Sequence, residues 1–311
     1  MKDRRAPDPM DSAAGTTLGG PADPRDWLVC FDLGNVVVRI CQDWRQACER
    51  AGLPVHPEVE SELTRRLIAD LDHRHEIHAI GNDDFYREVA KAASGRYTPR
   101  EVESIHAAWL LGEHPGMSDL IDELAAAGIE TACLSNTNDA HWTMMMASLP
   151  PSGSPAVADR PGPPRGCADL DDDGRQIEET GGTPNGPAVA SSRSGVECQV
   201  RRAGDAGGSS DRTWNRPWPQ PAFPGFAMLK HRFASHTARL AKPSPEIYRA
   251  FEQAVGRTGD RIIFFDDRED NVGAALALGW RAYLVDKSGD VADQVRRVLG
   301  GVGVLPRADG G

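Results

Sequence analysis

The sequence lacks the features that mark exported, zinc-binding or membrane-spanning proteins. Its six cysteines form no Cys-x-x-Cys pair and show no metal-type spacing, so neither a zinc site nor a disulfide framework is expected. It contains no run of about 18 or more apolar residues, the length that a membrane-spanning helix needs. Residues 1–26 also lack the apolar segment of a secretory signal. We therefore expect a cytoplasmic protein without a membrane partner.

The chain also lacks an excess of basic residues. It has 35 lysines and arginines against 46 aspartates and glutamates, a formal net charge of -11. A general nucleic-acid binder needs a basic surface to neutralise phosphates. We therefore expect no nucleic-acid partner.

Large aliphatic residues are scarce in residues 150–225, and residues 1–26 are rich in Pro, Gly, Asp and Ala. These segments are predicted to be a low-complexity insertion (150–225) and a disordered tail (1–26), and residues 301–311 are predicted to be a C-terminal tail. Such stretches bury too little apolar surface to offset the entropy of ordering them. The sequence does not indicate whether the insertion has a partner.

The remaining sequence alternates between short apolar runs and amphipathic helical patterns. Strands are predicted at 27–33, 129–135, 261–267 and 281–286, with a weaker candidate at 230–236. Continuous apolar strands that alternate with helices are typical of a parallel sheet covered on both faces. The predicted fold is a doubly wound α/β core built from 27–40, 115–149 and 226–300.

Residues 41–114 break this alternation because only helical patterns occur there. One of these helices begins with a capping box from Thr98 to Glu101. A group of helices inserted after the first strand is predicted to form a small α-helical cap. Within it, His73, His75 and His78 are predicted to lie on a polar surface.

Polar residues follow several of the predicted strands, at the sheet edge where open α/β folds bind ligands. Asp32, Ser135 and the pair Asp266 and Asp267 end strands, and Lys242 follows the weaker strand. Clustered carboxylates repel one another unless a cation neutralises them, and oxygen ligands of this kind suit Mg²⁺. A lysine and a hydroxyl beside such a cation would receive the oxygens of a phosphoryl group.

These motifs, in this order, resemble the haloacid dehalogenase (HAD) superfamily. The matching segments are "FDLGNVV", "LSNTN", "KP" followed by "IY", and "FFDD" followed by "DN". They most resemble the branch that includes alpha-D-glucose-1-phosphate phosphatase. The resemblance implies a HAD-like Rossmannoid core, a helical cap and a phosphatase activity on a small phosphorylated metabolite, with a sugar phosphate as the expected substrate.

The resemblance also implies a role for each motif residue. Asp32 would be the nucleophile that carries the phosphoryl group. Mg²⁺ would be held by Asp32, the backbone carbonyl of Gly34 and Asp267, with Asp266 assisting.

Further motif residues would contact the substrate or water. Ser135 and Lys242 would hold and neutralise the transferring phosphoryl group, and Asn136 would add an amide donor. Asp270 or Asn271 would orient water bound to the metal.

One position departs from the pattern of most phosphatases in the superfamily. The residue two after the nucleophile is usually a second Asp, which protonates the leaving oxygen and later activates water. Here it is Gly34, a change shared by the sugar-1-phosphate branch. Two alternatives stay open: a metal-independent 2-haloacid dehalogenase, and a non-catalytic interaction module that works through the insertion.

Overall fold

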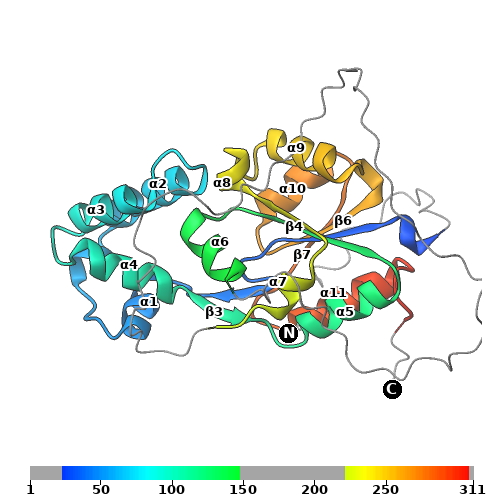
Figure 1. Ribbon diagram of the computed structural model, residues 1–311, viewed down its shortest axis with the longest axis horizontal. Helices are drawn as coiled ribbons and strands as arrows, with labels where there is room; N and C mark the ends of the chain where they lie inside the picture. Colours follow the sequence, from blue (N-terminus) through cyan, green and yellow to red (C-terminus); the bar gives the residue numbers. More distant parts are fainter. Residues whose placement is uncertain (1–22, 148–220, 308–311) are drawn as a thin grey trace, which may run out of the picture. The chain divides into compact units, whose positions relative to one another are not determined.

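The computed structural model describes residues 23–147 and 221–307, which contain a five-stranded sheet (Figure 1). The strand order is β5-β4-β1-β6-β7, and every neighbouring pair is parallel. The strands are β1 (Leu28–Phe31), β4 (Glu130–Ser135), β5 (His231–Ala234), β6 (Ile262–Asp266) and β7 (Arg281–Leu284). The predicted α/β fold is confirmed, and the weaker strand candidate forms one edge of the sheet.

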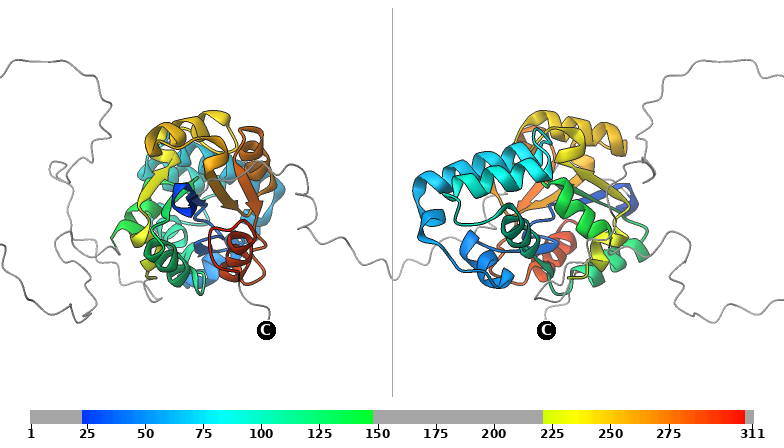
Figure 2. Two further views of the ribbon diagram at one scale, coloured as in Figure 1. Left: turned by 90° about the vertical axis from the view of Figure 1, so that its right-hand side faces the viewer. Right: turned by 60° about the vertical axis from the view of Figure 1, so that its left-hand side comes forward.

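Helices cover both faces of this sheet (Figures 1 and 2). They are α5 (Met117–Ala126) and α11 (Val291–Gly301) on one face, with α9 (Pro245–Val255) and α10 (Glu269–Ala277) on the other. Among the described residues, no helix combines the length and apolar character needed to cross a membrane.

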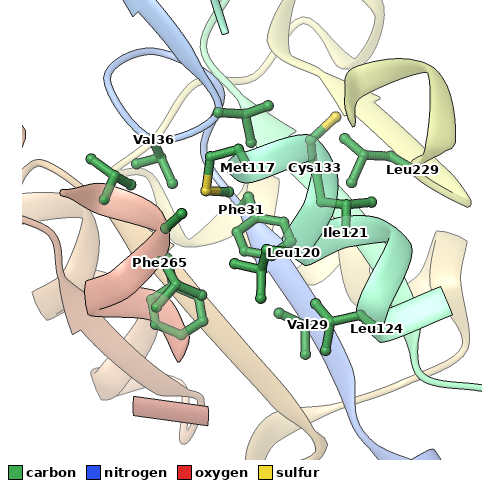
Figure 3. Packing of buried hydrophobic residues seen from close by; sticks show 14 of the residues in the cluster. Val29, Phe31, Val36, Met117, Leu120, Ile121, Leu124, Cys133, Leu229 and Phe265 are labelled. Carbon is green, nitrogen blue, oxygen red and sulfur yellow. The ribbon is translucent and has the colours of Figure 1, made fainter. Parts of the chain in front are cut away.

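Strand β1 shows why helices are needed on both faces. Val29 and Phe31 pack into the cluster that contains α5 and α11 (Figure 3), whereas Leu28 and Cys30 pack against α9 and α10. All four side chains are fully buried, because successive residues of a strand point to opposite faces. A continuous apolar run thus becomes the central strand of a three-layer core.

The topology places the predicted site residues together. From β1 the chain passes to β4 and β5 on one side, and then to β6 and β7 on the other. The ligand-binding crevice of an open α/β sheet lies where the strand order reverses, beyond the carboxyl ends of the strands. Asp32 follows β1 at this position, between the ends of β4 and β6.

The helices inserted after the first strand have an apolar cluster of their own. They are α1 (Trp44–Ala51), α2 (Glu62–Glu76), α3 (Asn82–Ala92) and α4 (Pro99–Ala108), with the 3-10 turn η3 (Pro57–Glu60). Phe85, Val89, Val102 and Ile105 are among its fully buried residues. The predicted capping box is present at the start of α4.

The prediction that 41–114 is entirely helical is wrong at its end. Residues Leu110–Glu113 form β3, which pairs antiparallel with β2 (Val38–Ile40). Gly112 has a φ of 110°, which no right-handed helix accommodates. The helical pattern therefore stops at Ala108, and the two-stranded ribbon leads the chain into and out of the helical insertion.

Two segments predicted to be irregular contribute to the core. Residues 221–225 belong to the described fold, where Phe223 is buried and α7 (Pro224–Met228) begins. Beyond α11, Val304 and Leu305 are also buried. Single apolar residues anchor these segments although the surrounding composition is polar. The rest of the predicted insertion, the tail at 1–22 and residues 308–311 lie outside the described residues.

Four short elements complete the described fold. They are α6 (Asp139–Met146), α8 (Ser235–Ala238) and the 3-10 turns η2 (Pro24–Asp26) and η4 (Gly259–Arg261).

Candidate active site

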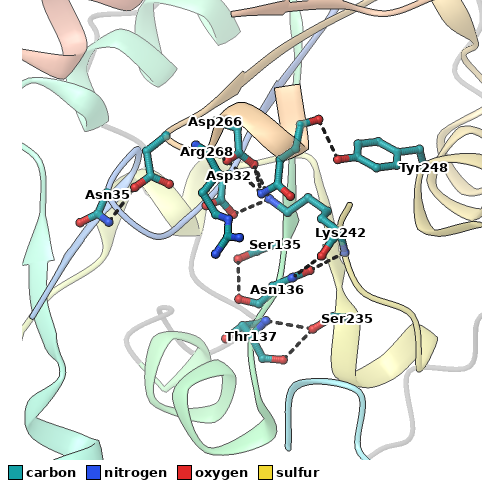
Figure 4. A network of polar contacts seen from close by, with 12 residues as sticks. Asp32, Asn35, Ser135, Asn136, Thr137, Ser235, Lys242, Tyr248, Asp266 and Arg268 are labelled. Atoms are coloured by element: carbon teal, nitrogen blue, oxygen red, sulfur yellow. Dashed lines mark hydrogen bonds and ion pairs between the residues drawn. The ribbon is translucent and has the colours of Figure 1, made fainter. Parts of the chain in front are cut away.

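Lys242 joins the two central acids of the predicted site (Figure 4). Its Nζ lies 2.8 Å from Asp32 Oδ1 and 2.6 Å from Asp266 Oδ2. The lysine side chain is 1% exposed and that of Asp266 is fully buried, whereas Asp32 keeps 11% of its side chain exposed. The three charges, which we call the charged cluster, therefore leave Asp32 as the most accessible member.

The surroundings of Asp266 fix its orientation. The Asn271 amide Nδ2 lies 3.0 Å from both carboxylate oxygens, and the Arg268 backbone N–H donates to Oδ1 at 3.0 Å. Asn271 therefore holds an acid in place. Asp270, the other residue predicted to orient water, is exposed and paired with Arg268.

Asp267 is held from a different direction. Asn35 Nδ2 donates to Asp267 Oδ2 at 2.9 Å, and Lys287 Nζ lies 3.6 Å from the same oxygen. Asn35 adopts a φ of 59°, in the left-handed region that asparagine tolerates better than most residues. Sequence reasoning assigned Asn35 no role, because its contact spans 232 positions of the chain.

Three carboxylates converge closely enough to share a cation. Asp32, Asp266 and Asp267 each offer an oxygen that lies within 4.8 Å of the other two. Hard oxygen donors in this arrangement fit Mg²⁺ better than softer metals. The residues present therefore fit the cation that the sequence predicted.

Two of the predicted phosphoryl-binding residues, Ser135 and Asn136, make different contacts. Ser135 is buried at the end of β4, and its Oγ lies 3.4 Å from the Asn136 carbonyl oxygen. The Asn136 amide pairs with the backbone of Lys242, accepting from its N–H at 2.8 Å and donating to its carbonyl at 3.0 Å. Asn136 thus positions the lysine, a different partner from the phosphoryl group predicted for it.

Burial and charge set the protonation of Asp32 and Lys242. Burial raises the pKa of Asp32 to about 7, although the Lys242 ammonium opposes this rise. Burial also disfavours the charge of Lys242, but the two carboxylates outweigh it and raise the lysine's pKa. Lys242 therefore stays charged, and Asp32 depends on nearby cations to remain ionised at neutral pH.

Gly34 leaves space beside Asp32. A Cβ added there would lie 3.4 Å from Ile40 Cδ1 and 3.8 Å from Asp32 Oδ2, ordinary contact distances. Its φ is not in the left-handed region. The backbone therefore does not require glycine at this position. The absence of an acid here changes the chemistry that the site can perform, without any need in the backbone geometry.

Two acids of α2 were missed by sequence reasoning. Asp72 and Glu76 lie four residues apart, so they share a face of the helix. Burial raises the pKa of each carboxyl to about 7. The Glu76 carboxyl also interacts electrostatically with Asp32 and Lys242. Their spacing was a usable signal, but it did not show that this face is turned toward the site.

The three histidines predicted to lie on a polar surface differ in their exposure. His73 and His78 are exposed, but His75 is 1% exposed and stacks on Phe85. The prediction is therefore wrong for His75, which lies on the buried face of α2. The other buried residues of that face are Thr64, Ile68 and Leu71, spaced three or four positions apart.

No protein-family model matches the chain. It is 45% identical over 72 residues to Phosphatase MT3486 of Mycobacterium tuberculosis, an alignment that covers 23% of this chain and 33% of the relative. It is 31% identical over 96 residues to Enolase-phosphatase E1 of Streptomyces avermitilis, covering 31% and 38%. The chain thus spans little more than a third of the length of these curated relatives.

Solved structures match over much more of the chain. A HAD family enzyme of Bacteroides thetaiotaomicron has a TM-score of 0.56 at 16% identity, covering 87% of this chain and 98% of that chain. Its complex with magnesium and inorganic phosphate has a TM-score of 0.52 at the same identity, covering 87% and 99%. The fold is of the HAD type, as the motifs predicted, and the sugar-phosphate branch stays a prediction.

Proposed function

Starting from a fold of the haloacid dehalogenase type, we propose that this chain is a Mg²⁺-dependent phosphatase acting on a small phosphorylated metabolite. The observation that carries the proposal is the charged cluster, in which Asp32 Oδ1 lies 2.8 Å from the buried Lys242 ammonium. Placing a partly exposed carboxylate among buried charges costs folding free energy. Such an arrangement at a ligand-binding sheet edge is typical of a catalytic site.

Asp32 is the nucleophile in this proposal. One of its oxygens attacks phosphorus while the bond from phosphorus to the leaving oxygen breaks, which gives an aspartyl-phosphate. Water then attacks the phosphorus and releases inorganic phosphate, and Asp32 regains its carboxylate. Lys242 neutralises charge throughout, and Ser135 donates a hydrogen bond to the phosphoryl oxygens.

The cation would be held by Asp32, Asp267 and the Gly34 carbonyl, with Asp266 assisting. When bound, Mg²⁺ neutralises the charge that otherwise repels an anionic phosphate from an anionic carboxylate. Asn35 and Asn271 keep two of the acids oriented toward it.

The substrate we propose is a sugar phosphate. The motif resemblance to the sugar-1-phosphate branch supports it, and two relatives carry the name phosphatase. Gly34 supports it as well, because an anomeric phosphate leaves more readily than the phosphate of a simple alcohol.

The test is a panel of phosphorylated metabolites and p-nitrophenyl phosphate, assayed for phosphate release with and without Mg²⁺. We expect release that requires Mg²⁺, with a sugar phosphate among the best substrates. Halide release from 2-chloropropionate without metal would instead identify a dehalogenase. Inactivity on both would favour an interaction module that uses the 150–225 segment.

A further inference from the structure

The site contains a nucleophile and a place for a cation, but it has no acid at the position beside the nucleophile. Gly34 occupies that position and has no side chain to protonate a leaving oxygen. A substrate with a poor leaving group needs such an acid, which contributes typically 10² to 10⁴-fold to the rate. If this chain hydrolyses such substrates, another residue must supply the proton.

Glu76 is positioned at the cap side of the site. Its carbonyl oxygen lies 2.7 Å from Ser235 Oγ, and the same Oγ accepts a hydrogen bond from the Thr137 N–H at 2.9 Å. Thr137 is two residues beyond Ser135, and Figure 4 shows its contacts with Ser235. The end of α2 is therefore fastened to the loop that follows β4. This short connection places residue 76 beside the phosphoryl-binding end of the sheet.

The carboxyl group of Glu76 lies near enough to the charged cluster for its pKa to respond to Asp32 and Lys242, as it does to the neighbouring Asp72. Among the described residues no hydrogen bond or ion pair engages its side chain. A carboxylate in the last turn of a helix is also disfavoured by the helix dipole. Neither pairing nor helix stability therefore accounts for an acid at this position.

We propose that Glu76 is the general acid and base of the reaction, in the role that an aspartate at position 34 would have. This inference rests on the proposed phosphatase function. It assigns a catalytic role to a residue of the cap helices.

The proton balance follows from this role. As Asp32 attacks phosphorus, the Glu76 carboxyl gives its proton to the leaving oxygen, so that an alcohol departs and Glu76 becomes a carboxylate. In the second step Glu76 takes a proton from the water that attacks the aspartyl-phosphate. Inorganic phosphate then leaves and Glu76 is protonated again. The raised pKa of Glu76, about 7, suits both steps at neutral pH.

The test compares Glu76→Gln with Asp70→Asn, a control on the same helix. The Asp70 carboxylate is exposed and pairs with Arg74, away from the charged cluster. Each variant is assayed for kcat/KM on p-nitrophenyl phosphate, whose leaving group departs without protonation, and on an alkyl phosphate, whose leaving group requires it.

For Glu76→Gln we expect kcat/KM to fall by about 10²-fold or more on the alkyl phosphate and to change little on p-nitrophenyl phosphate. Asp70→Asn should leave both values unchanged. An equal fall on both substrates, or no fall on either, would overturn the proposal. Inactivity of the wild type on both would instead reject the phosphatase function itself.

A second variant covers the case in which Glu76→Gln does not fold. Glu76→Ala is assayed on the alkyl phosphate with and without added formate. Recovery of hydrolysis with formate would support the proposal because the small acid replaces the missing carboxyl group. Activity that formate does not change would contradict it.

Discussion

The described residues include two groups of ionisable side chains, buried or half-buried, that differ in whether they keep their charge. The charged cluster keeps full charges by pairing Lys242 with Asp32 and Asp266. The second group, which we call the histidine cluster, consists of His75, His106 and His141 from α2, α4 and α6. Its rings contact one another, and His106 and His141 are stacked with centroids 3.9 Å apart.

The hydrogen bonds of His106 and His141 require neutral rings. Asn138 Oδ1 accepts from the His141 backbone N–H, which directs its Nδ2 toward His106 Nε2 at 3.2 Å and His141 Nδ1 at 3.3 Å. Both ring nitrogens therefore accept hydrogen bonds. Burial lowers the pKa of His106, and it lowers that of His141 to about 4.

This difference in charge indicates which of the two groups has a chemical role. Keeping charges inside a protein costs free energy that neutral groups avoid. The charged cluster lies at the ligand-binding edge of the sheet, where our proposal uses its charges. The histidine cluster joins cap helices to the start of α6 by neutral hydrogen bonds, which assigns it a structural role.

The largest effect is expected from Lys242→Met, which removes the positive charge of the charged cluster. Asp32 and Asp266 would be left buried without their counterion, and breaking a buried pair costs about 3–5 kcal/mol. Urea unfolding should show this loss, and phosphate release should be abolished. The control is Lys91→Met, which removes an exposed pair with Glu88 worth about 0–1 kcal/mol. A similar small loss for both variants would remove the contrast between buried and surface charge.

Asn35→Gly tests how strongly the orientation of an acid matters. Glycine keeps the positive φ of Asn35 without strain but removes the amide that donates to Asp267. Loss of a residue that orients a metal ligand typically weakens metal affinity by about 10–100-fold. The Mg²⁺ concentration that gives half-maximal activity should rise by that factor. An unchanged Mg²⁺ dependence would show that Asp267 needs no such support.

His141→Phe tests whether the histidine cluster is neutral, because phenylalanine preserves a ring against His106 but does not titrate. The folded-state pKa of His141 is about 4, below the value of about 6.5 expected when unfolded. Its contribution to stability is therefore complete above about pH 6.5 and is lost as the pH falls toward 4. The stability difference between wild type and variant should shrink by about 2 kcal/mol from pH 6.5 to pH 5.

The acids with raised pKa values do not confuse this comparison, because they titrate in both proteins. They are Asp32, Asp72, Glu76 and Glu113. Their contribution has the opposite sign, since protonating them in the folded state adds stability as the pH falls. It cancels in the comparison. A difference independent of pH would mean that His141 is charged, or free to become charged, in the fold.

The smallest effect is expected from Asp270→Asn. Its carboxylate is exposed and paired with Arg268, outside the charged cluster, and such pairs contribute about 0–1 kcal/mol. Phosphate release and stability should both stay near those of the wild type. A large fall in activity would restore the water-orienting role that the motif resemblance implied for this residue.

The sequence predicted the sheet and the charged cluster because both depend on local patterns. Asp32, Ser135 and Asp266 follow apolar runs, and the parallel topology brings the ends of those runs together. The strands of the ribbon at 38–40 and 110–113 were missed because three or four residues are too few to establish a period.

The other residues that were missed depend on contacts between distant parts of the chain. Asn35 contacts Asp267, and Ser235 contacts Glu76 across 159 positions. The burial of His75 likewise depends on how α2 packs against α3 and α4. Such contacts depend on packing between elements, which a single sequence does not display.

The most direct test of the account is Mg²⁺-dependent phosphate release by Asp32→Asn beside the wild type. The substitution keeps the shape of the side chain and removes its nucleophilic charge. We expect the rate to fall by roughly 10⁴-fold or more, while circular dichroism shows a folded protein. A folded Asp32→Asn variant, free of deamidated protein, that retained the wild-type rate would show that Asp32 is not the nucleophile.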